Sequence, residues 1–129
     1  MNTEITRTVL VVDDAMTIRK YHRTLLEELG CEVVEAENGI DALEKLLEHQ
    51  LSLCLVDVNM PLMDGFTFVT ELRKGAEQAD CPVIMISTES QQGELSRGYQ
   101  CGVNLYLVKP APAESLKLYC QQLMEGSVQ

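Results

Sequence analysis

The chain has 129 residues, enough for one domain with a single sizeable core and too few for two. Hydrophobic residues make up 46% of it, which excludes a disordered acidic tail, and a formal net charge of -10 opposes contact with nucleic-acid phosphates or an anionic membrane. The first residues, MNTEITR, contain no apolar signal region, and no apolar stretch approaches the roughly 20 residues that span a bilayer. We therefore expect a cytoplasmic protein whose partners are proteins or cations, without direct nucleic-acid binding or membrane insertion.

Short apolar runs alternate with helical patterns along the chain. The runs predict strands at 9–12, 31–36, 53–56, 83–86 and 105–108. Apolar residues at helical spacing predict helices over 18–29, 40–47, 66–72 and 116–123, with a weaker helix within QQGELSRGYQC, residues 91–101. Gly30 is placed to stop the first helix and Asp64 to cap the third.

Five β-α repeats predict a doubly wound α/β sandwich with a five-stranded parallel sheet. In such folds, ligands bind outside the carboxyl ends of the strands, so the residues that follow each strand are the first candidates for a site. Those residues are Asp13, Asp14, Asp57, Ser87 and Lys109.

Three acids, a hydroxyl and an amine at one edge suggest metal-assisted phosphoryl chemistry. Clustered carboxylates without histidine or thiolate ligands suit a hard ion such as Mg²⁺. Asp57 could then act as a nucleophile toward phosphorus, with Lys109 balancing charge and Ser87 donating a hydrogen bond. The alternative is that each acid only caps a helix and that the lysine and serine are ordinary surface groups. That alternative would require all five to gather by coincidence.

Four segments at separate strand ends carry a family resemblance: VLVVDDA (9–15), LVDVNMPLMDG (55–65), PVIMIST (82–88) and YLVKP (106–110). In this order and spacing they resemble the receiver domain of two-component response regulators, over nearly the whole chain. The resemblance implies a flavodoxin-like (βα)5 fold with strand order 2-1-3-4-5.

The resemblance also implies roles for individual residues. Asp57 corresponds to the phospho-acceptor, Asp14 to a direct Mg²⁺ ligand and Asp13 to the acid that holds a metal-bound water. Asp57 and the backbone carbonyl of Asn59 complete the metal site, which Mn²⁺ could also occupy. Lys109 corresponds to the phosphate-contacting lysine.

Further positions correspond to the family's switch and rate-tuning residues. Ser87 matches the hydroxyl that moves toward the phosphoryl group, and Tyr106 matches the aromatic switch. Asn59, Thr88 and Glu89 match positions that tune the phosphoryl lifetime. Thr88 departs from the Ala or Gly often found there, and its bulk could narrow the approach of water. The Lys109–Pro110 bond is commonly cis in the family.

The length implies a stand-alone receiver over residues 1–129, with a core of about 8–125 and no output domain. We expect a CheY-like regulator that accepts a phosphoryl group on Asp57 from a CheA-like histidine kinase. It would control a protein such as a flagellar motor switch protein, with a phosphatase as a possible further partner. It would transfer phosphoryl groups only to itself and hydrolyse them, without conventional enzyme turnover.

Three alternatives stay open at this point. One is a phosphorelay intermediate or phosphate sink in another motility pathway. Another is a phosphatase of the haloacid-dehalogenase type, which the chain resembles less because Asn59 stands where that class carries a second acid. The third is a scaffold that no longer uses phosphate.

The remaining reactive side chains predict no second site. The five cysteines include no C-x-x-C pair and are interpreted as buried or half-buried reduced thiols. His22 and His49 have no matching ligand cluster and are expected to be solvated.

Overall fold

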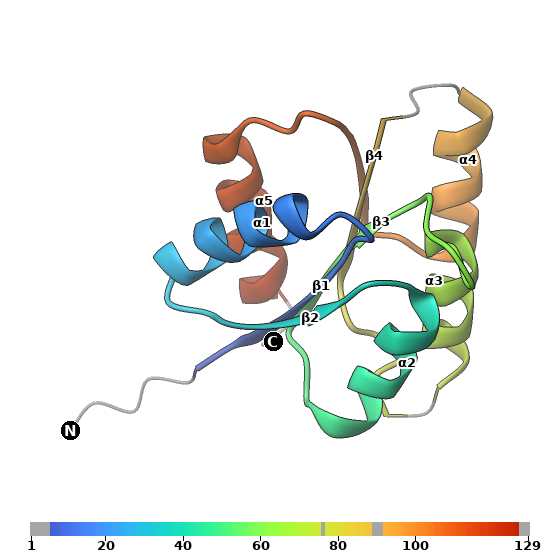
Figure 1. Cartoon of the computed structure of the whole chain (residues 1–129), viewed down its shortest axis with the longest axis horizontal. Helices are drawn as coiled ribbons and strands as arrows, with labels where there is room; N and C mark the ends of the chain where they lie inside the picture. The colour runs from blue at the N-terminus through green and yellow to red at the C-terminus, as the bar shows by residue number, and fades with distance from the viewer. Residues whose placement is uncertain (1–5, 76, 89–91, 127–129) are drawn as a thin grey trace.

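The computed structural model describes residues 6–75, 77–88 and 92–126, which alternate between strand and helix (Figure 1). The strands are β1 (Thr8–Val12), β2 (Glu32–Ala36), β3 (Leu53–Asp57), β4 (Val83–Ser87) and β5 (Leu105–Val108). The helices are α1 (Met16–Glu28), α2 (Gly39–Glu48), α3 (Gly65–Lys74), α4 (Gln92–Cys101) and α5 (Ala113–Gly126). Each segment predicted from the spacing of apolar residues therefore overlaps an observed element.

The strands form one parallel sheet in the order β2-β1-β3-β4-β5, which confirms the flavodoxin-like topology. The chain starts in the middle of the sheet, moves to one edge and then returns past β1 to build the other half. This reversal puts a topological switch point between the carboxyl ends of β1 and β3, where ligands bind in such folds.

Helices cover both faces of the sheet, with α1 and α5 on one face and α2, α3 and α4 on the other (Figure 1). Side chains of a strand alternate between the two cores: Val9 and Val11 pack toward α1 and α5, whereas Leu10 and Val12 pack toward the other helices. Every residue of β3 and β4 is buried. This two-sided burial explains why their sequences are continuous apolar runs.

The predicted helix cap is present. The Asp64 side chain accepts a hydrogen bond of 2.8 Å from the backbone N–H of Thr67, at the start of α3. Such a cap satisfies one of the donors that the first turn leaves unpaired. The cap also fixes where α3 begins, and therefore the length of the loop that follows Asp57.

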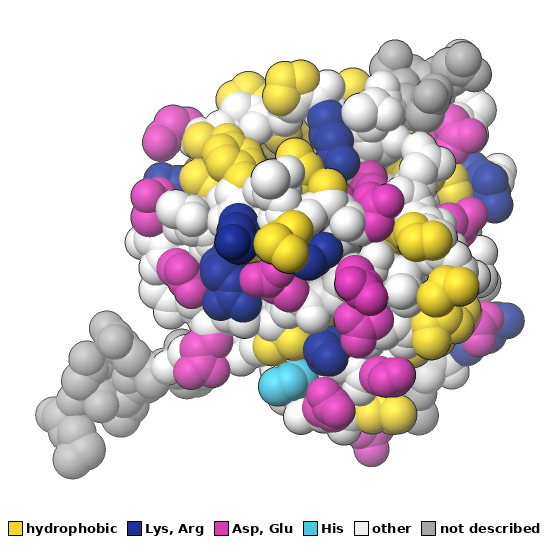
Figure 2. Space-filling model, in the orientation of Figure 1, with side chains coloured by type: hydrophobic (Ala, Val, Ile, Leu, Met, Phe, Trp, Pro, Cys, Tyr) yellow, Lys and Arg dark blue, Asp and Glu magenta, His cyan; other side chains and the backbone are white. Residues whose placement is uncertain are grey.

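Acidic side chains are spread over the visible surface of the molecule (Figure 2), in keeping with the net charge of -10. Among the helices that the structure describes, none has the length and apolar character needed to cross a membrane.

The histidine expectation is wrong for His22. This residue of α1 is only 6% exposed, and its ring lies 5.6 Å from that of Tyr21, centroid to centroid. Position 22 lies four residues after Ile18 and three before Leu25, so helical spacing places it on the apolar face of α1 together with the buried Leu25. Burial lowers the pKa of His22, so the imidazole is held neutral near neutral pH.

Candidate functional site

Three aspartates meet at the carboxyl ends of β1 and β3. Asp13 and Asp14 directly follow β1, and Asp57 is the last residue of β3. One carboxylate oxygen from each residue lies within 4.8 Å of the other two. Asp13 and Asp57 are buried, whereas Asp14 is exposed. The parallel pairing of β1 with β3 brings these distant sequence positions to one point.

Lys109 reaches this cluster from the loop after β5. Its Nζ atom lies 3.2 Å from Asp13 Oδ2 and 3.2 Å from Asp57 Oδ1. Burial by itself would lower the pKa of the Lys109 ammonium, but the charges of Asp57 and Asp13 outweigh burial and raise it. The lysine therefore stays protonated and bridges the two buried carboxylates.

One ammonium does not fully compensate three carboxylates. Burial, followed by repulsion from Asp13, raises the pKa of Asp57 to about 6 despite the attraction of Lys109. Asp57 is therefore mostly ionised at neutral pH, at a free-energy cost that an added cation would relieve.

The donor set fits a hard divalent cation. Carboxylate oxygens are the ligands that Mg²⁺ and Mn²⁺ prefer, and Mg²⁺ typically takes one or two carboxylates and keeps several waters. The exposed Asp14 leaves one side of the cluster open to solvent for those waters. Asp13, Asp14 and Asp57 could hold such an ion together.

The other predicted residues lie in the segments around the cluster. Ser87 ends β4 with no exposed surface, and its carbonyl accepts a hydrogen bond of 2.7 Å from the backbone N–H of Lys109. Thr88 is exposed directly after β4, and Asn59 is exposed in the loop that follows Asp57. Glu89 lies outside the described residues. The Lys109–Pro110 peptide bond is cis.

The loop after Asp57 is held close to that residue by Gly65. A Cβ atom on Gly65 would overlap the backbone carbonyl of Asp57, and the Gly65 N–H donates a hydrogen bond of 2.9 Å to the Val58 carbonyl. Glycine is therefore required here by the close approach of two backbone segments, and a larger residue would displace the main chain of Asp57.

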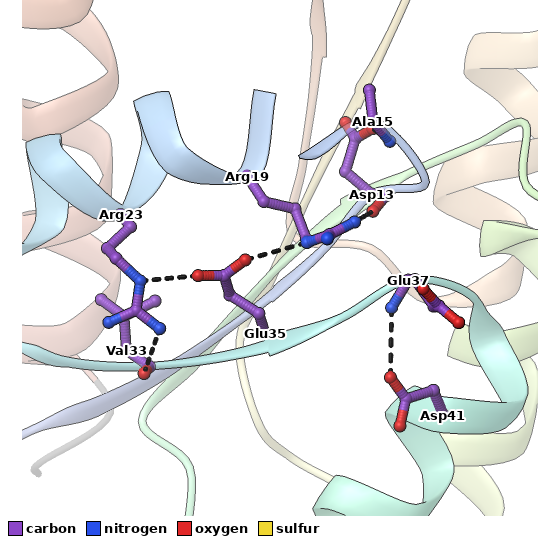
Figure 3. Close-up of polar contacts among 8 residues, drawn as sticks. All are labelled: Asp13, Ala15, Arg19, Arg23, Val33, Glu35, Glu37 and Asp41. Carbon is purple, nitrogen blue, oxygen red and sulfur yellow. Dashed lines mark hydrogen bonds and ion pairs between the residues drawn. The ribbon is translucent and has the colours of Figure 1, made fainter. Parts of the chain in front are cut away.

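A clamp of charged residues, which the sequence did not reveal, fixes the end of β1 (Figure 3). Arg19 of α1 donates from its NH1 group to the backbone carbonyl of Asp13 at 2.7 Å, and from Nε to Glu35 of β2 at 2.9 Å. Arg23 donates to the other Glu35 oxygen at 2.6 Å. The three elements follow one another in the chain, but only the packing of α1 beside β1 and β2 brings these groups into contact. The clamp ties β1, β2 and α1 together beside the aspartates.

Tyr106 of β5 is packed inward against α4. It is 5% exposed, and its ring lies so close to Gly98 that a Cβ atom there would come within 2.8 Å of the ring. The backbone N–H of Tyr106 donates to the hydroxyl of Tyr99 at 3.2 Å. Gly98 therefore provides the space that the buried ring occupies.

Comparisons with known proteins identify the family of this chain. A family model described as the response regulator receiver domain matches residues 9–121. The chain is 40% identical to chemotaxis protein CheY1 of Helicobacter pylori over 84% of its length and 90% of that protein. It is 35% identical to protein PilG of Pseudomonas aeruginosa, over 84% of this chain and 80% of PilG.

A solved structure shares the fold. Chemotaxis protein CheY4 of Vibrio cholerae superposes with a TM-score of 0.87 at 34% identity, covering 92% of this chain and 99% of that one. The family match spans all four strand-end segments and most of the chain. The chain therefore belongs to the response regulator receiver domain family.

Proposed function

We propose that this chain takes a phosphoryl group from a phosphohistidine of a sensor kinase onto Asp57, and that the modified protein controls a protein partner. The observation that carries the proposal is the meeting of three carboxylates, from Asp13, Asp14 and Asp57, with the Lys109 ammonium bridging two of them. The same groups would be an expensive arrangement in a protein that used neither a cation nor a phosphoryl group.

Asp13, Asp14 and Asp57, with the backbone carbonyl of Asn59, would hold the Mg²⁺ ion. When bound, the ion neutralises charge on the carboxylates and on the phosphoryl oxygens. Arg19 supports the site by fixing the carbonyl of Asp13.

Asp57 supplies the nucleophile. One of its carboxylate oxygens attacks phosphorus, the bond from phosphorus to the donor's imidazole nitrogen breaks, and the electron pair returns to that nitrogen. In the second half of the cycle, water attacks phosphorus and the bond from phosphorus to the Asp57 oxygen breaks. This step releases inorganic phosphate and restores the Asp57 carboxylate. Lys109 balances the added charge, and Thr88, Asn59 and Glu89 tune the access of water. The chain thus modifies and restores itself, without turnover of an external substrate.

The signal would leave the site through Ser87 and Tyr106. A phosphoryl group adds nearly two negative charges and strong acceptors next to Lys109 and the Ser87 hydroxyl. Movement of Ser87 toward it alters the space available to Tyr106, whose ring already packs on α4. The responding surface is the face formed by α4, β5 and α5.

Similarity to CheY1 and CheY4 supports a chemotaxis role for a stand-alone receiver with a core of about 8–125. On this proposal the donor is a CheA-like histidine kinase, the target is a protein such as a flagellar motor switch protein, and a phosphatase acts on the phosphorylated form. A strongly acidic surface suits protein partners with basic contact surfaces.

Intact mass spectrometry tests the proposal. The protein is incubated with Mg²⁺ and a small acyl phosphate, and the same is done for Asp57→Asn. The matched control is Asp80→Asn. Asp80 is an exposed aspartate that precedes β4, so it lies near the amino ends of the strands, away from the carboxyl end where Asp57 lies. We expect one phosphoryl adduct on the wild type and on Asp80→Asn, lost when Mg²⁺ is chelated, and none on Asp57→Asn.

The other outcomes identify the rejected alternatives. Many turnovers of a phosphate ester per protein molecule would indicate a phosphatase of the haloacid-dehalogenase type. A folded wild-type protein that gains no adduct would indicate a scaffold and would overturn the proposal.

A further inference from the structure

Two buried cysteines from different parts of the chain face each other in the core. Cys54 belongs to β3, and Cys81 lies just before β4. Their Sγ atoms are 3.9 Å apart, within reach of a sulfur hydrogen bond, although 27 residues separate them in the sequence. Cys54 has no exposed surface, and Cys81 is 6% exposed. The pair therefore lies in the core, with Cys81 nearer to solvent.

The two thiols are chemically unequal. The hydrogen bond between the two thiols lowers the pKa of Cys81, and the positive charge of Arg73 lowers it further against the effect of burial. The same hydrogen bond, together with complete burial, raises the pKa of Cys54. Cys81 is thus the thiol that more readily becomes a thiolate, the nucleophilic form.

Arg73 also holds the segment that carries Cys81. Its NH1 group donates to the carbonyls of Ala79 at 2.8 Å and Cys81 at 2.6 Å, and its NH2 group donates to the carbonyl of Gly102 at 2.7 Å. These bonds fix the backbone at Cys81 and keep a cation next to it. The short distance between the two sulfurs and the cation fixed beside Cys81 favour joining these two thiols on oxidation, with Cys81 the one nearer to the surface.

We propose that Cys54 and Cys81 form a reversible redox site that hydrogen peroxide converts to an intramolecular disulfide. The Cys81 thiolate attacks one peroxide oxygen, the O–O bond breaks, and hydroxide leaves, giving a sulfenic acid on Cys81. The Cys54 sulfur then attacks the Cys81 sulfur, and water leaves with the Cys54 proton. Two thiols and one peroxide thus give one disulfide and two waters. A dithiol reductant reverses the change.

This site is separate from the aspartate cluster and does not depend on the proposed function. The disulfide would join the amino-terminal half of β3 to the segment before β4, and Asp57 lies at the other end of β3. The sequence alone suggested unpaired reduced thiols, because nothing in the spacing of residues 54 and 81 indicates contact.

The opposite face of the sheet provides an internal comparison. Cys31 and Cys120 are also buried, but the Cys31 sulfur lies 4.0 Å from the sulfur of Met124. Burial raises the pKa of Cys120 to about 12, and burial also raises the pKa of Cys31. These two thiols should therefore resist peroxide under conditions that oxidise Cys81.

The test is disulfide mapping of the full chain. Native protein is treated with hydrogen peroxide, remaining thiols are alkylated, and the protein is digested with trypsin. Cleavage after Lys45, Arg73, Lys74 and Arg97 puts Cys54 and Cys81 on different peptides, 46–73 and 75–97. We expect these two peptides to become cross-linked with the loss of two hydrogen atoms, and a dithiol reductant should separate them again. Cys31 and Cys120 should remain thiols through the peroxide treatment and be recovered in alkylated form.

A variant separates the two steps. In Cys54→Ala the cross-link should disappear, and a sulfenic-acid probe such as dimedone should label Cys81. Native wild-type protein that keeps both thiols free while Cys101 or other thiols oxidise would overturn the proposal. So would a Cys31–Cys120 cross-link forming at the same rate. The wild-type mapping decides the question even if the variant does not fold.

Discussion

Asp57 and Asp14 carry the same side chain in different environments, and this difference separates their proposed roles. Asp57 is 8% exposed and packed beside Asp13, so its carboxylate is poorly solvated. Asp14 is exposed, so its carboxylate is hydrated and can exchange water for another partner at little cost. A desolvated carboxylate suits a nucleophile, and an exposed one suits a ligand that exchanges with solvent.

The raised pKa of Asp57 predicts a pH-dependent stability in the absence of divalent cations. The folded pKa is about 6, compared with an ordinary value of 3.8, so the native state binds the proton more tightly than the unfolded state. The stabilisation that proton binding to Asp57 gives the native state is complete below about pH 4 and is lost as pH rises through about 6. Across this window the loss should approach about 3 kcal/mol.

Asp57→Asn should not show this loss. Urea unfolding measured from about pH 4 to 8 in a chelating buffer should show the variant becoming more stable than wild type as pH rises. Asp80→Asn serves as the control, and added Mg²⁺ should narrow the difference between wild type and Asp57→Asn at neutral pH. A difference that did not change with pH would show that Asp57 ionisation is not the cause.

At the scale of elements, α4 contains two glycines with different surroundings. A Cβ atom on Gly93 would meet nothing within 4 Å, whereas one on Gly98 would come within 2.8 Å of the Tyr106 ring. Glycine lowers helix stability in both cases, by about 1 kcal/mol relative to alanine. Only at Gly98 does this cost provide room for a neighbouring side chain.

We therefore expect the two glycines to respond differently to replacement by alanine. Gly93→Ala should raise the free energy of unfolding by about 0.5 to 1 kcal/mol through helix propensity. Gly98→Ala should give no gain, because the added Cβ atom would displace the Tyr106 ring. Urea unfolding measures the stabilities, and the ring resonances of Tyr106 in an NMR spectrum report its environment. Equal stabilisation by both substitutions would show that the ring has room to spare.

At the scale of the whole molecule, the aspartate cluster and α4 are connected through the sheet. Asp57 ends β3, and Ser87 ends the adjacent β4. Lys109 directly follows β5, and Tyr106 of β5 packs against α4. Each step is a contact between neighbouring strands or between a strand and a helix. A change at Asp57 can therefore alter the packing of α4 without any contact between the two.

Phosphorylation should accordingly change hydrogen exchange in α4. We expect the amides of residues 92–101 to exchange at different rates after treatment with Mg²⁺ and an acyl phosphate, since α4 packs on the residue proposed to respond. Exchange measured by mass spectrometry on wild type and on Asp57→Asn gives the comparison. Unchanged exchange in a fully phosphorylated wild-type protein would refute this connection.

The sequence by itself determined the fold and the composition of the candidate site. Strands buried on both sides must be apolar throughout, so their ends are visible as the points where Asp13, Asp57 and Lys109 begin. Parallel strands place all these ends on one edge, which is why residues far apart in the sequence could be assigned to one cluster. Local rules were also sufficient for the Asp64 cap.

Only the tertiary structure decided which side chains meet across elements. The contact of Arg19 with Glu35 and the approach of Cys54 to Cys81 depend on how helices and strands pack. Periodicity gives the face of a helix but not the partner opposite each residue. The pKa of Asp57 has the same origin, because burial and the distance to Asp13 and Lys109 set it. These contacts exist only once the sheet has assembled.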